Sequence, residues 1–185
     1  MTAYIIKRRI NFFALAWLFA LLSAANGYAQ SYTYANHTEA GIMVGTLGGL
    51  PVNFQTFNGI RFKKLQLEAG LTIGIDSYQQ IVLVPVAAGL RCYLNHAKTA
   101  PYFGMDAGYS FDWVEKETSD LKFGGGYMLN PVVGLRFGNL KPNKTTLSVG
   151  YRHQLASAEE GFNQLYTTKR EYSFNRITIR FGLSY

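Results

Sequence analysis

One segment of this sequence carries residue types that could form a nucleophilic pair. In residues 150–157 (GYRHQLAS), His153 stands four positions before Ser157, and residues an even number apart share one face of a strand. A histidine beside a serine hydroxyl can take up its proton during acyl transfer. Such a pair also requires a group that orients the histidine, and no carboxylate is clearly placed beside His153. We therefore expect a protein that is not an enzyme, with a hydrolase as the alternative.

Two further patterns in the sequence bear on ligand chemistry. The histidines, His37, His96 and His153, are scattered and lack the spacing that a metal site requires. The glycine triplet 124–126 opens a strand rather than a helix, so it lacks the helix N-terminus that cradles phosphate in Gly-rich loops. We expect no cofactor and no metal.

A different group of reactive residues is charged and lies within segments of alternating polarity. Two of them are carboxylates, Glu68 and Asp106, and two are arginines, Arg91 and Arg180. Counted from the ends of their segments they lie at similar depths, and a buried charge is tolerated only when it is paired. Arginine can contact a carboxylate at two points. We expect one packed cluster of Glu68, Asp106, Arg91 and Arg180, with Arg136 nearby.

The elements that position these charges are long strands. Apolar and polar residues alternate with period 2, which is typical of a strand between two different environments. Most runs span about 11–14 residues, more than the ~5–6 common in globular proteins and enough for a tilted strand to cross a bilayer. The expected strands cover approximately 41–48, 52–62, 64–75, 81–94, 101–113, 126–138, 144–154 and 173–185.

These strands predict an all-β fold, an eight-stranded antiparallel up-and-down transmembrane β-barrel that follows an N-terminal signal peptide. The apolar face would contact lipid and the glycine-rich polar face would line a narrow lumen. The alternative is a soluble lipocalin-like barrel, in which the two faces are reversed. Aromatic residues near strand ends suggest a girdle at the membrane interface: Phe62, Tyr93, Tyr102, Phe111, Trp113, Tyr127, Phe137, Tyr151 and Tyr185.

The first residues have the pattern of an export signal. A basic stretch, residues 7–9, precedes the apolar residues 10–22, and Gly27 and Ala29 precede a cut before Gln30. The apolar stretch, about 13 residues, is shorter than the ~20 that a spanning helix needs. The expected organisation is a signal peptide at 1–29, a short lead-in at 30–40 and the barrel at 41–185.

The charge balance argues against a nucleic-acid partner. Of the 18 lysines and arginines, three lie in the signal, which contains none of the 11 acidic residues, so the remaining chain has fifteen bases against eleven acids. That net charge of +4 over 156 residues is modest for one domain. The links after alternate strands are short, whereas 114–125 and 155–172 are long. We expect these two loops to form the contact surface of the protein, unless they are merely solvated.

With the signal peptide, the amphipathic strands and the alternation of short turns and long loops, the chain resembles small OmpA/OmpX-type bacterial outer-membrane β-barrels. In that family the terminal aromatic strand is read by the barrel-assembly machinery, which would here read Phe181, Leu183 and Tyr185. The resemblance also implies an outer-membrane location, contact with membrane lipid and lipopolysaccharide, and a monomer. It favours a role in envelope structure or surface interaction, with a lipid-modifying enzyme or a small-solute channel as alternatives.

The enzyme alternative rests on a second, looser resemblance. Residues 150–157 are similar to the catalytic stretch of outer-membrane lipid A deacylases, in which a histidine stands two residues before the serine. That position is Leu155 here, and the asparagine of the motif is replaced by Ala158. These departures place the hydrolase activity in doubt.

Overall fold

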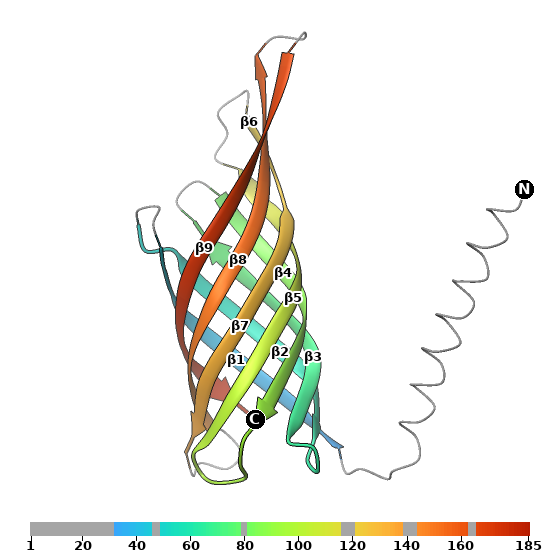
Figure 1. Ribbon diagram of the computed structural model, residues 1–185, viewed down its shortest axis with the longest axis vertical. Helices are drawn as coiled ribbons and strands as arrows, with labels where there is room; N and C mark the ends of the chain where they lie inside the picture. Colours follow the sequence, from blue (N-terminus) through green and yellow to red (C-terminus); the bar gives the residue numbers. More distant parts are fainter. Residues whose placement is uncertain (1–31, 46–48, 79–80, 116–120, 139–143, 163–165) are drawn as a thin grey trace, which may run out of the picture. The chain divides into compact units, whose positions relative to one another are not determined.

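The wall of the barrel is a closed antiparallel sheet (Figure 1). The computed structural model describes residues 32–45, 49–78, 81–115, 121–138, 144–162 and 166–185; the expected signal peptide, 1–29, lies outside them. Among the described residues, no helix is long and apolar enough to cross a membrane. The strands are β1 (Tyr32–Val44), β2 (Val52–Phe62), β3 (Leu67–Ser77), β4 (Ile81–Tyr93), β5 (Ala100–Glu115), β6 (Leu121–Gly124), β7 (Gly126–Phe137), β8 (Lys144–Phe162) and β9 (Tyr166–Ser184).

Each strand except β6 pairs with the wall strands on both sides of it, and the sheet closes where β1 pairs with β9. Both β6 and β7 pair with β8, so they are consecutive pieces of one wall strand, separated at Gly125. The nine assigned segments therefore make eight wall strands. The predicted eight-stranded up-and-down barrel is confirmed.

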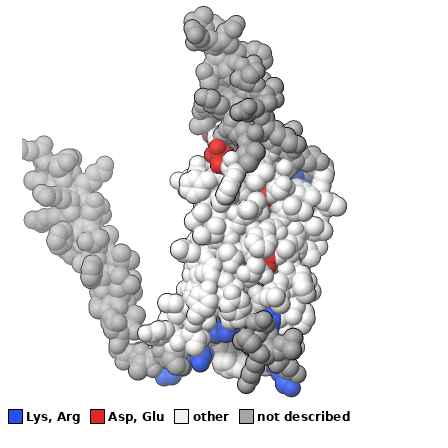
Figure 2. Space-filling view, turned by 180° about the vertical axis from the view of Figure 1, so that it is seen from behind, with Lys and Arg blue, Asp and Glu red and all other residues white. Residues whose placement is uncertain are grey.

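The two faces of the wall are separated by residue parity. Along β9, Ile177, Ile179 and Phe181 are 52%, 44% and 59% exposed, whereas Arg176 and Arg180 are 4% and 1% exposed. Figure 2 shows the wall as an almost uncharged surface, with Lys and Arg gathered along its lower rim. Since apolar side chains face outward and charged ones inward, the transmembrane orientation is correct and the lipocalin-like alternative is wrong.

The first strand begins earlier than the sequence pattern indicates. β1 starts at Tyr32, so the expected lead-in, 30–40, is largely part of the barrel wall and the predicted start at 41 is wrong. The reason is that the outward face is polar at this point. Asn36 donates to Asn58 (2.8 Å), and Thr38 contacts Thr56 (3.2 Å), so the outward positions of this segment do not show the apolar alternation.

Most of the second expected loop is also strand. β8 and β9 remain paired from Leu155↔Ser173 to Phe162↔Tyr166, and this β8–β9 hairpin rises beyond the rest of the wall at the top of Figure 1. The first expected loop, 114–125, is shortened because β5 continues to Glu115 and β6 covers Leu121–Gly124. In both segments backbone pairing continues without the apolar alternation that marks a membrane strand.

Two aromatic residues assigned to the girdle lie inside the barrel instead. Tyr93 and Tyr102 are 4% and 1% exposed, because they share the inward parity of Arg91 and Asp106. Space for one ring comes from Gly134, where a Cβ would lie 2.4 Å from Cζ of Tyr102. Other members of the predicted girdle do stand exposed on the outer surface: Phe111, Trp113, Tyr127, Tyr151 and Tyr185.

The assignment of the outward face predicts the cost of introducing a charge. Val149→Arg, in the middle of β8 and 49% exposed, should lower the free energy of unfolding by ~2–4 kcal/mol because the guanidinium would face hydrocarbon. Thr145→Arg, on the same face near the end of β8, should cost only ~0–1 kcal/mol. Urea unfolding of the barrel in lipid vesicles measures both, and equal small costs would show that the face is misassigned.

Candidate functional site

Charged side chains fill the lumen of the barrel. Four carboxylates, Glu39, Glu68, Asp76 and Asp106, are each at most 3% exposed. They come from β1, β3 and β5, and face arginines from β4, β7, β8 and β9. The buried arginines are Arg91, Arg136, Arg152, Arg176 and Arg180. Such burial is tolerated only where each charge has a partner.

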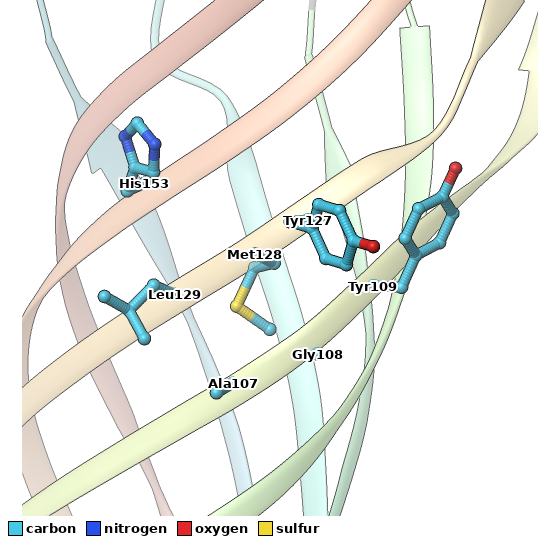
Figure 3. Close-up of a pocket in the computed structure, with 7 residues that line it drawn as sticks. All are labelled: Ala107, Gly108, Tyr109, Tyr127, Met128, Leu129 and His153. Carbon is cyan, nitrogen blue, oxygen red and sulfur yellow. The ribbon is translucent and has the colours of Figure 1, made fainter. Parts of the chain in front are cut away.

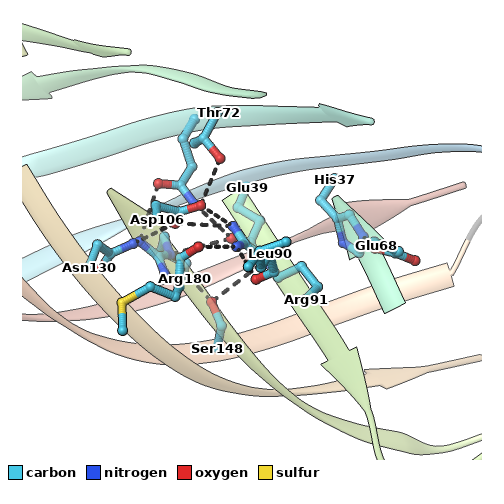
Figure 4. Close-up of polar contacts among 12 residues, drawn as sticks. His37, Glu39, Glu68, Thr72, Leu90, Arg91, Asp106, Asn130, Ser148 and Arg180 are labelled. Atoms are coloured by element: carbon cyan, nitrogen blue, oxygen red, sulfur yellow. Dashed lines mark hydrogen bonds and ion pairs between the residues drawn. The ribbon is translucent and has the colours of Figure 1, made fainter. Parts of the chain in front are cut away.

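Asp106 is the acceptor at the middle of the lumen (Figure 4). Its Oδ1 lies 2.8 Å from Nη2 of Arg91 and accepts a hydrogen bond from Oγ1 of Thr72 at 2.8 Å. Asn130, the residue opposite Asp106 on the neighbouring strand β7, donates to Oδ2 at 2.9 Å. The carboxylate therefore links β5 to three other wall strands.

Glu68 is the acceptor toward the end that carries the short turns 63–66 and 94–99, here called the short-turn rim. His37 Nε2 donates to its Oε2 at 2.5 Å, and the Tyr93 hydroxyl donates to the same oxygen at 3.2 Å. Its Oε1 accepts from Nε of Arg61 at 2.5 Å and from Nη1 of Arg136 at 3.4 Å. One carboxylate thus holds side chains from four wall strands.

Glu39 and Asp76 hold the remaining arginines. Glu39 pairs with Nε of Arg180 at 3.3 Å, and also accepts from the Tyr102 and Ser148 hydroxyls, both at 3.3 Å. Asp76 pairs with Arg152 at 3.0 Å and accepts from the Asn53 amide. Gln55 joins the two groups, because its Oε1 accepts from Arg152 at 3.1 Å and from Arg180 at 3.3 Å.

Apolar side chains pack inside the barrel at the end opposite the short-turn rim. Met43, Tyr78, Ile81 and Leu83 form a buried cluster, and Phe174 packs against it. The rings of Tyr78 and Phe174 stack with their centroids 4.8 Å apart. This apolar cluster and the ion pairs below it occupy successive levels of the lumen.

The five charged residues singled out in the sequence all lie in the lumen, but they do not form one cluster. Asp106 meets Arg91 and Glu68 meets Arg136, as expected of neighbours. Arg180 instead pairs with Glu39. Sequence reasoning missed three residues that take part in these contacts: His37, Glu39 and Asp76. The first two fell in the expected lead-in, and Asp76 fell one residue past its expected strand. Parity counted back from the outward apolar residues Ile42 and Val44 would have placed His37 and Glu39 inside.

The three residues of the terminal strand lie on the outer surface at the seam that closes the barrel. Phe181, Leu183 and Tyr185 are 59%, 48% and 49% exposed. Phe181 pairs with Ala40 of β1, and the Tyr185 amide donates to the carbonyl of Asn36 at 3.0 Å. This strand therefore completes the sheet.

His153 lines a shallow apolar pocket of about 530 Å³ on the wall formed by β5, β7 and β8 (Figure 3). The aromatic side chains of Tyr109 and Tyr127 border the pocket, and Gly108 lies in it. The Nδ1 of His153 donates to the Asn175 amide oxygen at 2.7 Å. Ser157 shares this face but lies four residues further along β8, about 13 Å away at strand spacing.

A closed eight-stranded wall, apolar outside and charged within, defines this chain as an outer-membrane β-barrel protein. The expected OmpA/OmpX-type architecture and outer-membrane location are confirmed. No protein-family model and no curated protein matches the sequence. Solved structures of small outer-membrane barrels do match its fold.

The outer membrane protein OprG from Pseudomonas aeruginosa matches with a TM-score of 0.58 and 12% identity, covering 84% of this chain and 96% of that one. The outer membrane protein AlkL matches with a TM-score of 0.54 and 13% identity, covering 86% of this chain and 91% of that one. Neisserial surface protein A matches with a TM-score of 0.52 and 12% identity, covering 84% of this chain and 98% of that one. At these identities the likeness concerns the fold alone.

The pairing of Glu39 with Arg180 predicts energetic coupling between them. Glu39→Gln should cost ~3–5 kcal/mol because it leaves a buried arginine without its counter-charge. In a double-mutant cycle with Arg180→Gln, the coupling energy should be ~1–3 kcal/mol. Urea unfolding in lipid vesicles gives the four free energies.

The matched control is the same cycle with Glu68→Gln in place of Glu39→Gln. Among the described residues no ion pair joins Glu68 to Arg180, so these costs should add to within ~0.5 kcal/mol. Equal coupling in the two cycles would contradict the pairing described above.

Proposed function

We propose that this protein is a non-enzymatic outer-membrane barrel whose lumen is closed by its own side chains, and that it acts in envelope structure or surface interaction. The observation that carries the proposal is the series of buried ion pairs in the lumen, which involve Glu68, Asp106, Glu39 and Asp76. An eight-stranded barrel has an interior just wide enough for side chains to fill.

Opening the lumen would require these pairs to separate. Arg152 and Arg180 are each 1% exposed, and Glu68 and Asp106 are 0% exposed. Separating a buried pair leaves an uncompensated charge, which costs several kcal/mol. The apolar cluster around Met43 and Leu83 adds a second barrier above the charges. Both features support a closed barrel over the small-solute channel considered from the sequence.

The β8–β9 hairpin is the element proposed to make surface contacts. Its backbone pairing extends to Phe162↔Tyr166, well past the other strands of the wall (Figure 1). Binding segments commonly project from a rigid scaffold. One of the structural neighbours is described as a surface protein, which agrees with this role. We further propose contact with lipopolysaccharide, insertion by the barrel-assembly machinery through Phe181, Leu183 and Tyr185, and a monomeric state.

The geometry around His153 supports the non-enzymatic part of the proposal. A base must lie within hydrogen-bond reach of the hydroxyl that it activates, whereas His153 and Ser157 are about 13 Å apart along β8. His153 is already held by Asn175 at 2.7 Å.

Planar-bilayer recordings test the closed lumen. The wild-type protein should form no stable large-conductance channel, because paired charged side chains and the apolar cluster occupy successive levels of the lumen. An Arg152→Ala/Arg180→Ala variant removes two of the largest buried side chains and should pass more current. This variant shows that the protein inserts into the bilayer and that the recording can detect an opened lumen. Stable, large wild-type channels from folded protein would overturn the proposal.

The absence of hydrolase activity is tested on lipid A. Mass spectra of lipid A should be the same for cells that express the wild type, cells that express Ser157→Ala and cells without the protein. Loss of an acyl chain in the wild type that Ser157→Ala abolishes would show that the protein is an enzyme after all.

A further inference from the structure

A pocket of about 280 Å³ opens at the short-turn rim. Its lining includes Arg61 at the end of β2, Lys63 in the turn 63–66, His96 in the turn 94–99, and Arg136 near the end of β7. Lys and Arg side chains are gathered at this end of the barrel in Figure 2. The pocket is therefore built from two short turns and the ends of wall strands.

The charge around this pocket is unbalanced. Three basic residues line the pocket, Arg61, Lys63 and Arg136, and the ion pairs described for the two arginines both go to Oε1 of Glu68. One carboxylate thus serves two guanidinium groups, and it is also shared with His37. Three cations against one carboxylate favour an anionic ligand.

Two hydrogen-bond donors that belong to residues lining the pocket lack an acceptor among the described residues. Nη2 of Arg61 and Nε of Arg136 are buried, and neither atom has a hydrogen-bond partner among the described residues. Arg136 itself is only 8% exposed, and its guanidinium lies over the ring of Tyr93, with Cζ 3.8 Å from the ring centroid. Because the ring covers one face of the guanidinium, its hydrogen bonds leave from the edge. A buried N–H without an acceptor is unfavourable, so these donors favour a ligand with several oxygens.

The turn that forms one wall of the pocket has an unusual backbone. Gln66 has a φ of 53°, the one positive φ at a non-glycine residue in the described part of the chain. Its carbonyl accepts from the Tyr93 amide at 2.8 Å, which fixes the turn against β4, and the residue lines the pocket. Conformations of this kind are disfavoured for residues with a Cβ and cluster at ligand sites.

We propose that this pocket binds a phosphate group. A guanidinium matches two phosphate oxygens at once, and the pocket offers two guanidinium groups already oriented by Glu68. Lys63 adds a further positive charge at the mouth. In outer-membrane barrels the short turns face the periplasm, where phosphate is presented by phospholipid headgroups of the inner leaflet and by soluble phosphorylated molecules.

The test is a titration of the folded protein with inorganic phosphate in phosphate-free non-ionic detergent, followed by the amide NMR signals of residues 63–66 and 93–96. We expect saturable shifts at these amides. Lys63→Gln should weaken binding about fivefold, the scale of an exposed charge contact. The matched control, Lys64→Gln, changes the neighbouring exposed lysine, which does not line the pocket, and should change affinity less than twofold.

A second variant reports on the buried donor. Arg136→Lys keeps the charge that faces Glu68 but removes Nε, so we expect about tenfold weaker phosphate binding. Its unfolding free energy, measured in parallel, separates loss of the ligand site from loss of the fold. Absence of saturable shifts in the wild type, equal weakening by Lys63→Gln and Lys64→Gln, or equal affinity for chloride would each overturn the proposal.

The same amides distinguish the sources of phosphate. Short-chain phosphatidylglycerol added to the micelles should shift them if a lipid headgroup is the ligand, whereas phosphatidylcholine, whose headgroup has no net charge, should shift them less. Binding of inorganic phosphate without a response to phosphatidylglycerol would assign the site to a soluble phosphorylated molecule. Both of these results support the pocket as a phosphate site.

Discussion

Pairing of charge inside a narrow lumen is the constraint on which the rest of this structure depends. A carboxylate or a guanidinium without a partner would be costly there, and each of the four buried carboxylates contacts an arginine. These contacts also restrict strand register. A slip of one residue would move Asp106 from the lumen to the lipid face and expose its charge to hydrocarbon. The ion pairs thus specify the alignment of the wall as well as filling it.

The barrel wall separates the lipid from the lumen, and the alternation of apolar and polar residues in its strands stops where the wall no longer lies between the two. Within the membrane, β9 presents Ile177, Ile179 and Phe181 to lipid and arginines to the lumen. Toward the tip of the β8–β9 hairpin, the backbone pairing of the two strands continues as far as Phe162↔Tyr166. Hydrogen bonding between two strands does not depend on which side chains they carry, so the hairpin persists where apolar alternation stops.

The sequence allows prediction of the strands that separate lipid from lumen, because only these strands show apolar alternation. The alternation in 173–185 identifies an amphipathic strand because opposite faces meet opposite environments. The ion-pair partners inside the lumen could not be derived in this way, because they depend on the register and stagger of strands that lie far apart in the chain, such as β1 and β9. Arg180 reaches Glu39, and Glu39 was missed because Asn36 and Thr38 make the outward face polar. The room for the Tyr102 ring likewise depends on Gly134 in the neighbouring strand β7.

The two ends of the lumen differ in a way that connects its closure to the rim pocket. One end is sealed by apolar packing around Met43 and Leu83, whereas the other ends in an excess of positive charge around Glu68. Glu68 and Tyr93 hold Arg136 in place before any ligand arrives. A ligand at the rim would therefore pay little conformational entropy on binding, and the added negative charge would balance the cations that Glu68 alone leaves in excess. The residues that close the barrel at this end are also the ones that make it a suitable anion site.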